Sequence, residues 1–180
     1  MLNFIKISTV TDQLFPEFFE LYLTSFPAAE RRTLTSLEDV MQNEESFNVF
    51  AILLEEKYVG FVCYWTFERF TFIEHFAVSP RMRGQHIGSN IIRMLQLQVK
   101  QPIVLEVETP QNKIAVRRIH FWERLGFYVL SNYYMQPPYD DSLFLIPMLI
   151  MSNDYHFANR HFQMIKDTLY KEVYNYIPEK

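Results

Sequence analysis

The sequence contains one cysteine and no long apolar segment, and these two absences exclude several classes of protein. Cys63 has no second thiol in the chain, so no intrachain disulfide can form. Because it sits in an apolar run, we expect a buried core thiol rather than a nucleophile. No apolar run approaches the ~20 residues that a membrane-spanning helix requires, and the N-terminal residues show no signal-peptide pattern. We therefore expect a soluble, cytoplasmic protein.

Motifs for nucleotide and metal chemistry are also absent. The sequence contains no G-x-x-x-x-G-K-[ST] and no G-x-G-x-x-G, which argues against a nucleotide hydrolase and a Rossmann dehydrogenase. It contains no H-E-x-x-H and no C-x-x-C, and its five histidines do not show the spacing of metal ligands. We expect a site without a metal ion.

The charge of the chain argues against nucleic acid as a partner. The formal net charge is −4 and the isoelectric point is about 5.7, whereas proteins that coat nucleic acid are strongly basic. The arginines nevertheless cluster locally, which one small polyanionic ligand explains better than a long one. These arginines are Arg81, Arg83, Arg93, Arg117, Arg118 and Arg124.

The periodicity of apolar residues predicts one domain of mixed α/β type. The chain has 180 residues, 49% of them apolar, which is enough for one sizeable core. Strands are expected at 2–8, 48–55, 59–69, 72–78, 103–108, 127–134 and 143–151, and helices at 12–26, 35–43, 88–100 and 112–126. An antiparallel pair flanked by alternating strands and helices indicates a mixed α/β sheet.

The stretch 72–95 predicts a site for an anion. A strand over 72–78 leads through Pro80 into a loop with Gly84 and Gly88, and a helix follows. Glycine lets the backbone approach a ligand, and the first amides of a helix have no partner within the helix. These amides and the positive end of the helix dipole favour a phosphate group.

This stretch resembles the acyl-CoA-binding motif of the GNAT superfamily of N-acetyltransferases. That motif is [Q/R]-x-x-G-x-[G/A] after a strand that often ends in A-V-x-P; here Arg83 and Gly88 match its first and last positions, and HFAVSP precedes them. His86 stands where the inner glycine is usual. Further on, Asn112 and the run RRIHFWERLGF resemble the family's N…A…FY-x-x-x-GF segment. The resemblance implies the GNAT N-acyltransferase fold over residues 1–151.

The resemblance also implies an activity, a co-substrate and a set of residues that bind it. The implied reaction moves an acetyl group from acetyl-CoA directly to a primary amine of a small molecule or peptide, without a metal or a covalent enzyme intermediate. Two alternatives are a non-catalytic acyl-CoA-binding module and a transferase for a longer acyl-CoA. The residues implied to bind the co-substrate are Phe76, Ala77, Val78, Arg83, Gly84, Gln85, His86, Ile87, Gly88, Ser89, Asn112 and Trp122.

Glu74 is the candidate general base. An alkyl ammonium has a pKa near ~10 and must lose a proton before it attacks. Strict alternation along 72–78 places Glu74 on one face with Phe72 and Phe76, where burial would raise the pKa of its carboxyl group. The alternative is that Glu74 pairs with a nearby arginine for structure alone.

Four further residues are candidates to contact the acceptor. By the resemblance, Glu30 and Arg31 lie in the segment that borders the acceptor site, although a solvated surface turn is the alternative. Glu106 and Glu108 share one face of the strand 103–108. They are the alternatives to Glu74 as base, and they are suited to an ammonium group. Their negative charge favours a cationic small molecule.

The general acid of the family has no counterpart at its usual position. Trp122 stands where the family often has the tyrosine that protonates the CoA thiolate, and an indole N–H does not transfer its proton at neutral pH. Either a neighbouring tyrosine serves, or the thiolate leaves unassisted. The neighbouring tyrosines are Tyr133, Tyr134 and Tyr139.

The residues 152–180 extend beyond the family's usual core. Their apolar residues recur at the spacing of an amphipathic helix, as Phe162, Ile165, Leu169 and Val173 show. We expect an extra C-terminal helix that packs back onto the domain. The alternatives are a homodimer contact and a lid over the acceptor cleft.

Overall fold

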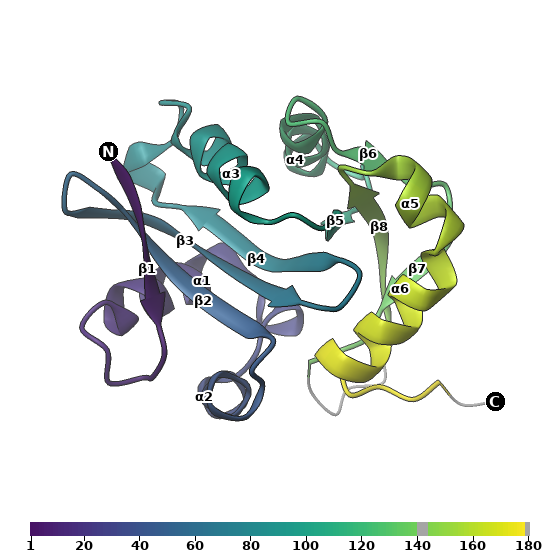
Figure 1. The fold of residues 1–180 in the computed structure, drawn as a ribbon, viewed down its shortest axis with the longest axis horizontal. Coiled ribbons are helices and arrows are strands. Elements are labelled where there is room, and N and C mark those ends of the chain that lie inside the picture. Colours follow the sequence, from purple (N-terminus) through teal and green to yellow (C-terminus); the bar gives the residue numbers. More distant parts are fainter. Residues whose placement is uncertain (140–143, 179–180) are drawn as a thin grey trace. The chain divides into compact units, whose positions relative to one another are not determined.

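The computed structural model describes residues 1–139 and 144–178, and within them the chain forms two compact units. The first unit is Met1–Gln101 and the second is Pro102–Lys180. Each unit has its own strands and helices, which Figure 1 colours from purple to yellow along the sequence.

The first unit is an antiparallel sheet with helices on both faces. Its strands pair in the order β1 (Leu2–Ile7), β2 (Phe47–Leu54), β3 (Lys57–Thr66) and β4 (Thr71–Val78). Its helices are α1 (Phe15–Ser25), α2 (Leu34–Asn43) and α3 (Ile87–Gln98), with short 3-10 turns η1 (Ala28–Glu30) and η2 (Pro80–Met82). Figure 1 shows α1 and α2 on one side of this sheet and α3 on the other. These elements confirm the strands and helices expected there to within a few residues.

Aromatic side chains hold α1 against the sheet. The rings of Phe18 and Phe61 meet edge to face with centroids 4.9 Å apart, and Tyr22 lies 6.0 Å from Phe61. All three side chains are buried. Each such aromatic residue contributes roughly 1.5–3 kcal/mol of burial free energy, so this contact fixes α1 and the segment that follows it.

A β-bulge at Glu74 shifts the alternation of β4. The β3–β4 register passes over Glu74, and the pairs on either side of it are Phe72 with Trp65, Ile73 with Tyr64, His75 with Cys63 and Phe76 with Val62. Residues that pair across strands share a face, so Phe72 and Phe76 lie on opposite faces. The expectation that both share a face with Glu74 was wrong, because a bulge adds one residue to one strand and reverses the faces beyond it.

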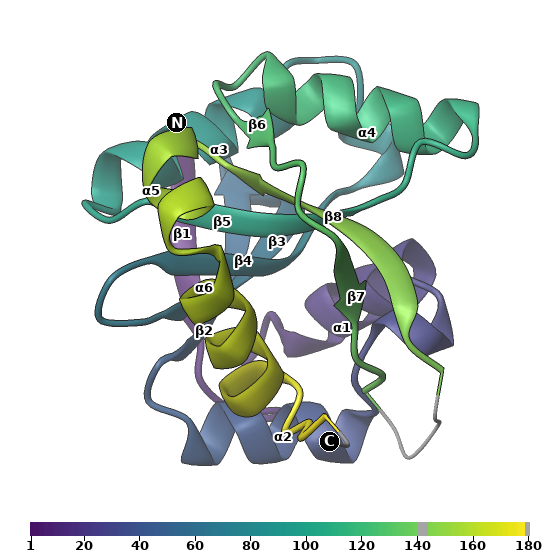
Figure 2. The same cartoon turned by 90° about the vertical axis from the view of Figure 1, so that its right-hand side faces the viewer.

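The second unit is built around strand β8 (Ile146–Ser152). This strand pairs antiparallel with β5 (Ile103–Glu108), β6 (Tyr128–Val129) and β7 (Tyr134–Gln136). The helix α4 (Lys113–Glu123) follows β5, and after β8 come α5 (Tyr155–Arg160), α6 (Phe162–Thr168) and the π-helical turn η3 (Leu169–Val173). In Figure 2, α5 and α6 follow one another beside β8 and β7.

Three expectations for this unit change in detail. The strand expected at 127–134 is two short strands, β6 and β7. The strand expected from Leu143 is observed as β8 from Ile146, and Leu143 itself lies outside the described residues. The expected single C-terminal helix is two helices and a π-helical turn, and its Tyr170 hydroxyl donates to the Met135 carbonyl at 2.6 Å. The C-terminal segment therefore packs on a strand of its own unit.

Candidate functional site

The loop between β4 and α3 bends twice into the left-handed region of backbone space. Gly84 has a φ of +79° and His86 a φ of +58°. No atom would lie within 4 Å of a Cβ at Gly84, so backbone conformation, not space, favours glycine there. The Nε of Arg83 donates to the Val78 carbonyl at 3.2 Å, which fixes the loop to the end of β4. These features form a turn that leads from the end of β4 into the start of α3.

The first turn of α3 presents backbone amides to this loop. His86 is the N-cap residue, and its side chain makes no capping hydrogen bond. The Asn90 amide donates to the His86 carbonyl at 3.0 Å, so the amides before Asn90 precede the helical ladder. The structure thus brings together most of the predicted cofactor-binding residues in one continuous turn, with exposed side chains at Arg81 and Arg83. Such a turn suits a phosphate group.

Glu74 lies in a buried ion pair. Its side chain is 0% exposed, its Oε1 accepts from the Arg32 Nε at 3.1 Å and its Oε2 accepts from the Trp65 Nε1 at 2.8 Å. The Arg32 guanidinium also lies 5.8 Å from the centre of the Trp65 ring. The arginine pairing considered as the alternative for Glu74 is therefore present, and Arg32 is a partner that the sequence pattern did not single out.

His75 ties the same strand to the segment between α1 and α2. Its Nε2 lies 2.8 Å from the Glu30 carbonyl oxygen, and the rings of Tyr22 and Phe26 stand 4.9 and 4.6 Å away. Burial lowers the pKa of His75, although the charge of Glu74 opposes that effect. A neutral imidazole facing a carbonyl donates from this nitrogen.

The acceptor candidates of the first unit lie in that same segment. The Arg31 Nε donates to the Phe26 carbonyl at 3.1 Å, and the Arg31 side chain is half-buried. Glu30 ends the 3-10 turn η1 and is half-buried as well. Because neither side chain is fully exposed, the segment is not the fully solvated surface turn considered as the alternative. Their roles toward an acceptor stay predictions.

Glu106 is held by two tyrosines in the second unit. It accepts hydrogen bonds from the hydroxyls of Tyr134 and Tyr174, the latter at 2.6 Å. Burial, together with the charge of Glu106, raises the pKa of both phenols well above its usual value. Of the candidate acids, Tyr134 therefore gives its hydrogen bond to Glu106, while Tyr133 is 78% exposed. A raised pKa makes Tyr134 a poorer proton donor to a thiolate.

The other candidates of the second unit have clear structural contacts. Glu108 pairs with the Arg118 Nη1 at 2.5 Å in a partly exposed position. The Asn112 Oδ1 accepts from the amides of Ile114 and Ala115, both at 2.9 Å, and so caps α4. Trp122 is buried and packs on the Phe127 ring with centroids 5.1 Å apart. Whether Asn112 and Trp122 also contact the co-substrate stays a prediction.

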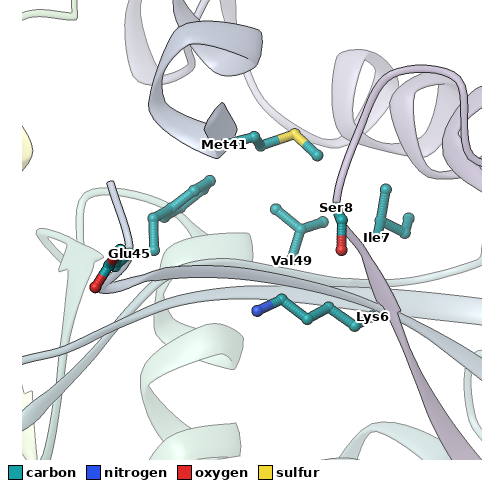
Figure 3. Close-up of a pocket in the computed structure, with 7 residues that line it drawn as sticks. Lys6, Ile7, Ser8, Met41, Glu45 and Val49 are labelled. Atoms are coloured by element: carbon teal, nitrogen blue, oxygen red, sulfur yellow. The ribbon is translucent and has the colours of Figure 1, made fainter. Parts of the chain in front are cut away.

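A small pocket beneath α2 contains none of the predicted residues. It measures about 110 Å³ and is lined by Lys6, Ile7, Ser8, Met41, Glu45, Phe47 and Val49. In Figure 3, Met41 from α2 faces Val49, whereas the Lys6 side chain lies on the other side of the strands. We interpret it as a packing gap between α2 and the first two strands.

Two negative observations hold for the part of the chain that the structure describes. Among residues 1–139 and 144–178, no three side chains of His, Cys, Asp or Glu gather closely enough to hold a metal ion. None of the helices in the same residues combines the length and apolar character needed to cross a membrane.

Comparison with known proteins shows the family. The family profile described as "Acetyltransferase (GNAT) family" matches residues 12–127. A solved structure from Bacteroides thetaiotaomicron, assigned to the GNAT family of acetyltransferases, is 34% identical with a TM-score of 0.92, covering 97% of this chain and 99% of that one. Among curated proteins no match was found.

More distant structures share the fold alone. Arabidopsis thaliana Naa50, in complex with the bisubstrate analogue CoA-Ac-MVNAL, has a TM-score of 0.60 at 19% identity, over 86% of this chain and 99% of its own. A GNAT acetyltransferase from Elizabethkingia anophelis with acetyl-CoA bound has a TM-score of 0.59 at 13% identity, over 84% and 96%. With its mixed α/β fold and its C-terminal helices, the chain belongs to the GNAT family of acetyltransferases and is an acyltransferase.

Proposed function

We propose that this protein transfers an acetyl group from acetyl-CoA to a primary amine of a small molecule or a peptide. The observation that carries the proposal is the turn from β4 into α3, in which two left-handed residues lead to a helix N-terminus. The acetyl-CoA in the Elizabethkingia structure and the CoA analogue in the Arabidopsis structure support it, because both proteins share this fold.

The co-substrate is assigned first to residues of the first unit. The amides of Ile87, Gly88 and Ser89 would hold the pyrophosphate, with charge supplied by Arg83. The backbone from Phe76 to Val78 would hold the pantetheine arm. Gly84, Gln85 and His86 shape the turn, and Asn112 and Trp122 are further candidates in the second unit.

The reaction proceeds by direct attack in a ternary complex. The neutral amine nitrogen forms a bond to the thioester carbonyl carbon, the C–S bond breaks, and the sulfur leaves with the bonding electrons. The nitrogen then releases one proton to solvent, and the departed thiolate takes up one proton from solvent. Backbone amides near Ala77 and Val78 would stabilise the oxyanion. We assign no tyrosine as general acid, because the pKa of Tyr134 is raised and the departing thiolate, with a pKa of about 8.5, leaves readily into water.

The acceptor is assigned by charge. In the second unit, Glu106 and Glu108 are the candidates to attract the ammonium group of the incoming amine. In the first unit, Glu30 and Arg31 are the candidates to contact the acceptor. Glu74 is the base predicted from the sequence. Its buried pairing with Arg32 supports a positioning role instead.

The test is a transfer assay with acetyl-CoA and a panel of amines. The panel contains a polyamine, an aminoglycoside, a free amino acid and a peptide with a free N-terminus, and turnover is read as release of free CoA thiol. Mass spectrometry must show one added acetyl group on the acceptor. The Gly88→Trp variant serves as the blocked control.

Three other results would change the assignment. Binding of acetyl-CoA without turnover on any amine would favour a non-catalytic binding module. Faster turnover with a longer acyl-CoA than with acetyl-CoA would favour the alternative of a transferase for a longer acyl-CoA. A reaction confined to neutral or anionic amines would contradict the assignment of Glu106 and Glu108.

A further inference from the structure

We propose that Glu74 is a positioning residue, which acts through Arg32 to hold the segment 27–33 in place, and that it does not accept the proton of the amine. The inference rests on the proposed function, since this segment contains two acceptor candidates. Arg32, Trp65, Glu74 and His75 are called the buried network.

The bulge in β4 makes this network possible. In a regular strand, neighbouring side chains point to opposite faces. At Glu74 and His75 the bulge turns both toward the same segment, and the His75 Nδ1 lies 3.9 Å from the Glu74 Oε1. A bulge next to a functional site commonly re-aims a side chain in this way.

The segment 27–33 is held at three points, two of them within the network and one at the Tyr22 hydroxyl. The Arg32 side chain donates to Glu74 at 3.1 Å, and the Arg32 backbone amide donates to the Tyr22 hydroxyl at 2.8 Å. The Glu30 carbonyl accepts from the His75 Nε2 at 2.8 Å. The segment has only one short 3-10 turn of its own, so these contacts set its position.

The contacts of Glu74 disfavour a role as base. Both carboxylate oxygens accept hydrogen bonds, and one of the donors is a guanidinium. The Glu74 side chain is 0% exposed, so both oxygens are occupied by protein donors and shielded from an incoming amine. A group in these surroundings is better suited to hold a partner than to collect a proton.

The inference therefore predicts which kinetic constant depends on the network. Glu30 and Arg31 are the acceptor candidates of the held segment. Loosening it should raise KM for the amine and leave KM for acetyl-CoA unchanged. A general base, by contrast, affects kcat through the chemical step and gives the pH profile an acidic limb of its own.

The decisive experiment compares single and double replacements by methionine. The variants are Arg32→Met, Glu74→Met and the double variant, with the milder Trp65→Phe as a fourth. The matched control is the double variant Lys171→Met and Glu172→Met, which removes an exposed ion pair with an N–O distance of 2.7 Å. Readouts are KM for each substrate, the pH profile of kcat/KM, and hydrogen exchange of the amides in 27–33.

The expected result is rescue in the double variant. Each single methionine removes one member of the buried ion pair and keeps the charge of the other, whereas two methionines replace the pair by apolar packing. We expect at least a tenfold loss of kcat/KM for the amine in each single variant, with faster exchange in 27–33. In the double variant, most of the lost kcat/KM and most of the slow exchange in 27–33 should return. The acidic limb of the pH profile should be unchanged. Trp65→Phe should raise KM for the amine alone.

Two results would overturn the inference. If the double variant is as inactive as Glu74→Met and has lost the acidic limb, Glu74 is the base. If exchange in 27–33 is the same in all variants, the network does not hold the segment. The exchange measurement needs only folded protein, so a wild type that acetylates no amine would contradict the proposed function while exchange still decides whether the network holds.

Discussion

Gly60 lies so close to Ala77 that a Cβ atom on Gly60 would stand 2.4 Å from the Ala77 carbonyl oxygen. Gly60 is on β3, and its cross-strand partner on β4 is Val78. Replacement by alanine must move the backbone of β4 where we place the pantetheine arm. We expect Gly60→Ala to cost about 1–3 kcal/mol of stability and to weaken CoA binding at least tenfold. Denaturant titration and calorimetry measure the two effects.

Loss of stability without loss of CoA affinity would contradict this account of Gly60. It would mean that β4 adjusts without disturbing the residues assigned to the co-substrate.

The left-handed conformation of His86 predicts an unusual ranking of substitutions. A Cβ atom in this region costs about 1–2 kcal/mol, so His86→Ala should be less stable than His86→Gly by about 1 kcal/mol. If backbone amides bind the phosphates, His86→Gly should bind CoA within about threefold of wild type. Thermal unfolding and calorimetry test both statements. A large loss of affinity in His86→Gly would show that the imidazole itself binds the ligand.

His75 should make the stability of the protein depend on pH. Burial lowers its pKa in the folded state, while the unfolded chain titrates near its usual value of about 6.5. Between the two values the unfolded state binds more protons, so this contribution is complete above about pH 6.5 and is lost as the pH falls through the folded value. The neighbouring charges act on the ring in opposite directions, because Glu74 raises the pKa of His75 and Arg32 lowers it.

The variant that tests this is His75→Gln, whose amide nitrogen can still donate to the Glu30 carbonyl. The fall in unfolding free energy from about pH 7.5 to about pH 5 should be smaller in His75→Gln than in wild type. Equal pH dependence in the two proteins would show that other groups cause it.

The hydrogen bond from Tyr174 to Glu106 should anchor the C-terminal segment. Tyr174→Phe removes the hydroxyl that donates at 2.6 Å and leaves the half-buried carboxylate of Glu106 with one donor fewer. We expect a loss of about 1–3 kcal/mol in unfolding free energy and faster exchange in 169–176. Tyr128→Phe, at a position 57% exposed, is the control and should change neither. Unchanged exchange in Tyr174→Phe would contradict this anchoring.

Much of the fold could be predicted because its signals are local. The turn at Gly84, the cap at Asn112 and the apolar spacing of α3 each depend on residues close in sequence. The bulge at Glu74 could not be predicted, because it depends on the register between two strands and leaves the apolar pattern intact. The break of the C-terminal segment at His161 interrupts no apolar spacing either.

The same distinction between local and long-range signals applies to the candidate site. The loop residues follow one another in sequence, so a motif of six positions found them. The partners of Glu74 are Arg32, 42 positions before it in the chain, and Trp65, nine positions before it. Contacts between residues so far apart follow no sequence periodicity, so the pattern of apolar residues could not predict them.

The central claim is that the turn from β4 into α3 binds the pyrophosphate of CoA, and a calorimetric titration with CoA tests it most directly. The proteins are wild type, Gly88→Trp, which places an indole in the turn, and Gln98→Trp, which places one at the exposed far end of α3. We expect saturable binding to wild type and to Gln98→Trp, and a loss of at least about a hundredfold, or about 2.7 kcal/mol, in Gly88→Trp. Absence of binding to wild type, or equal affinity in Gly88→Trp, would contradict the claim.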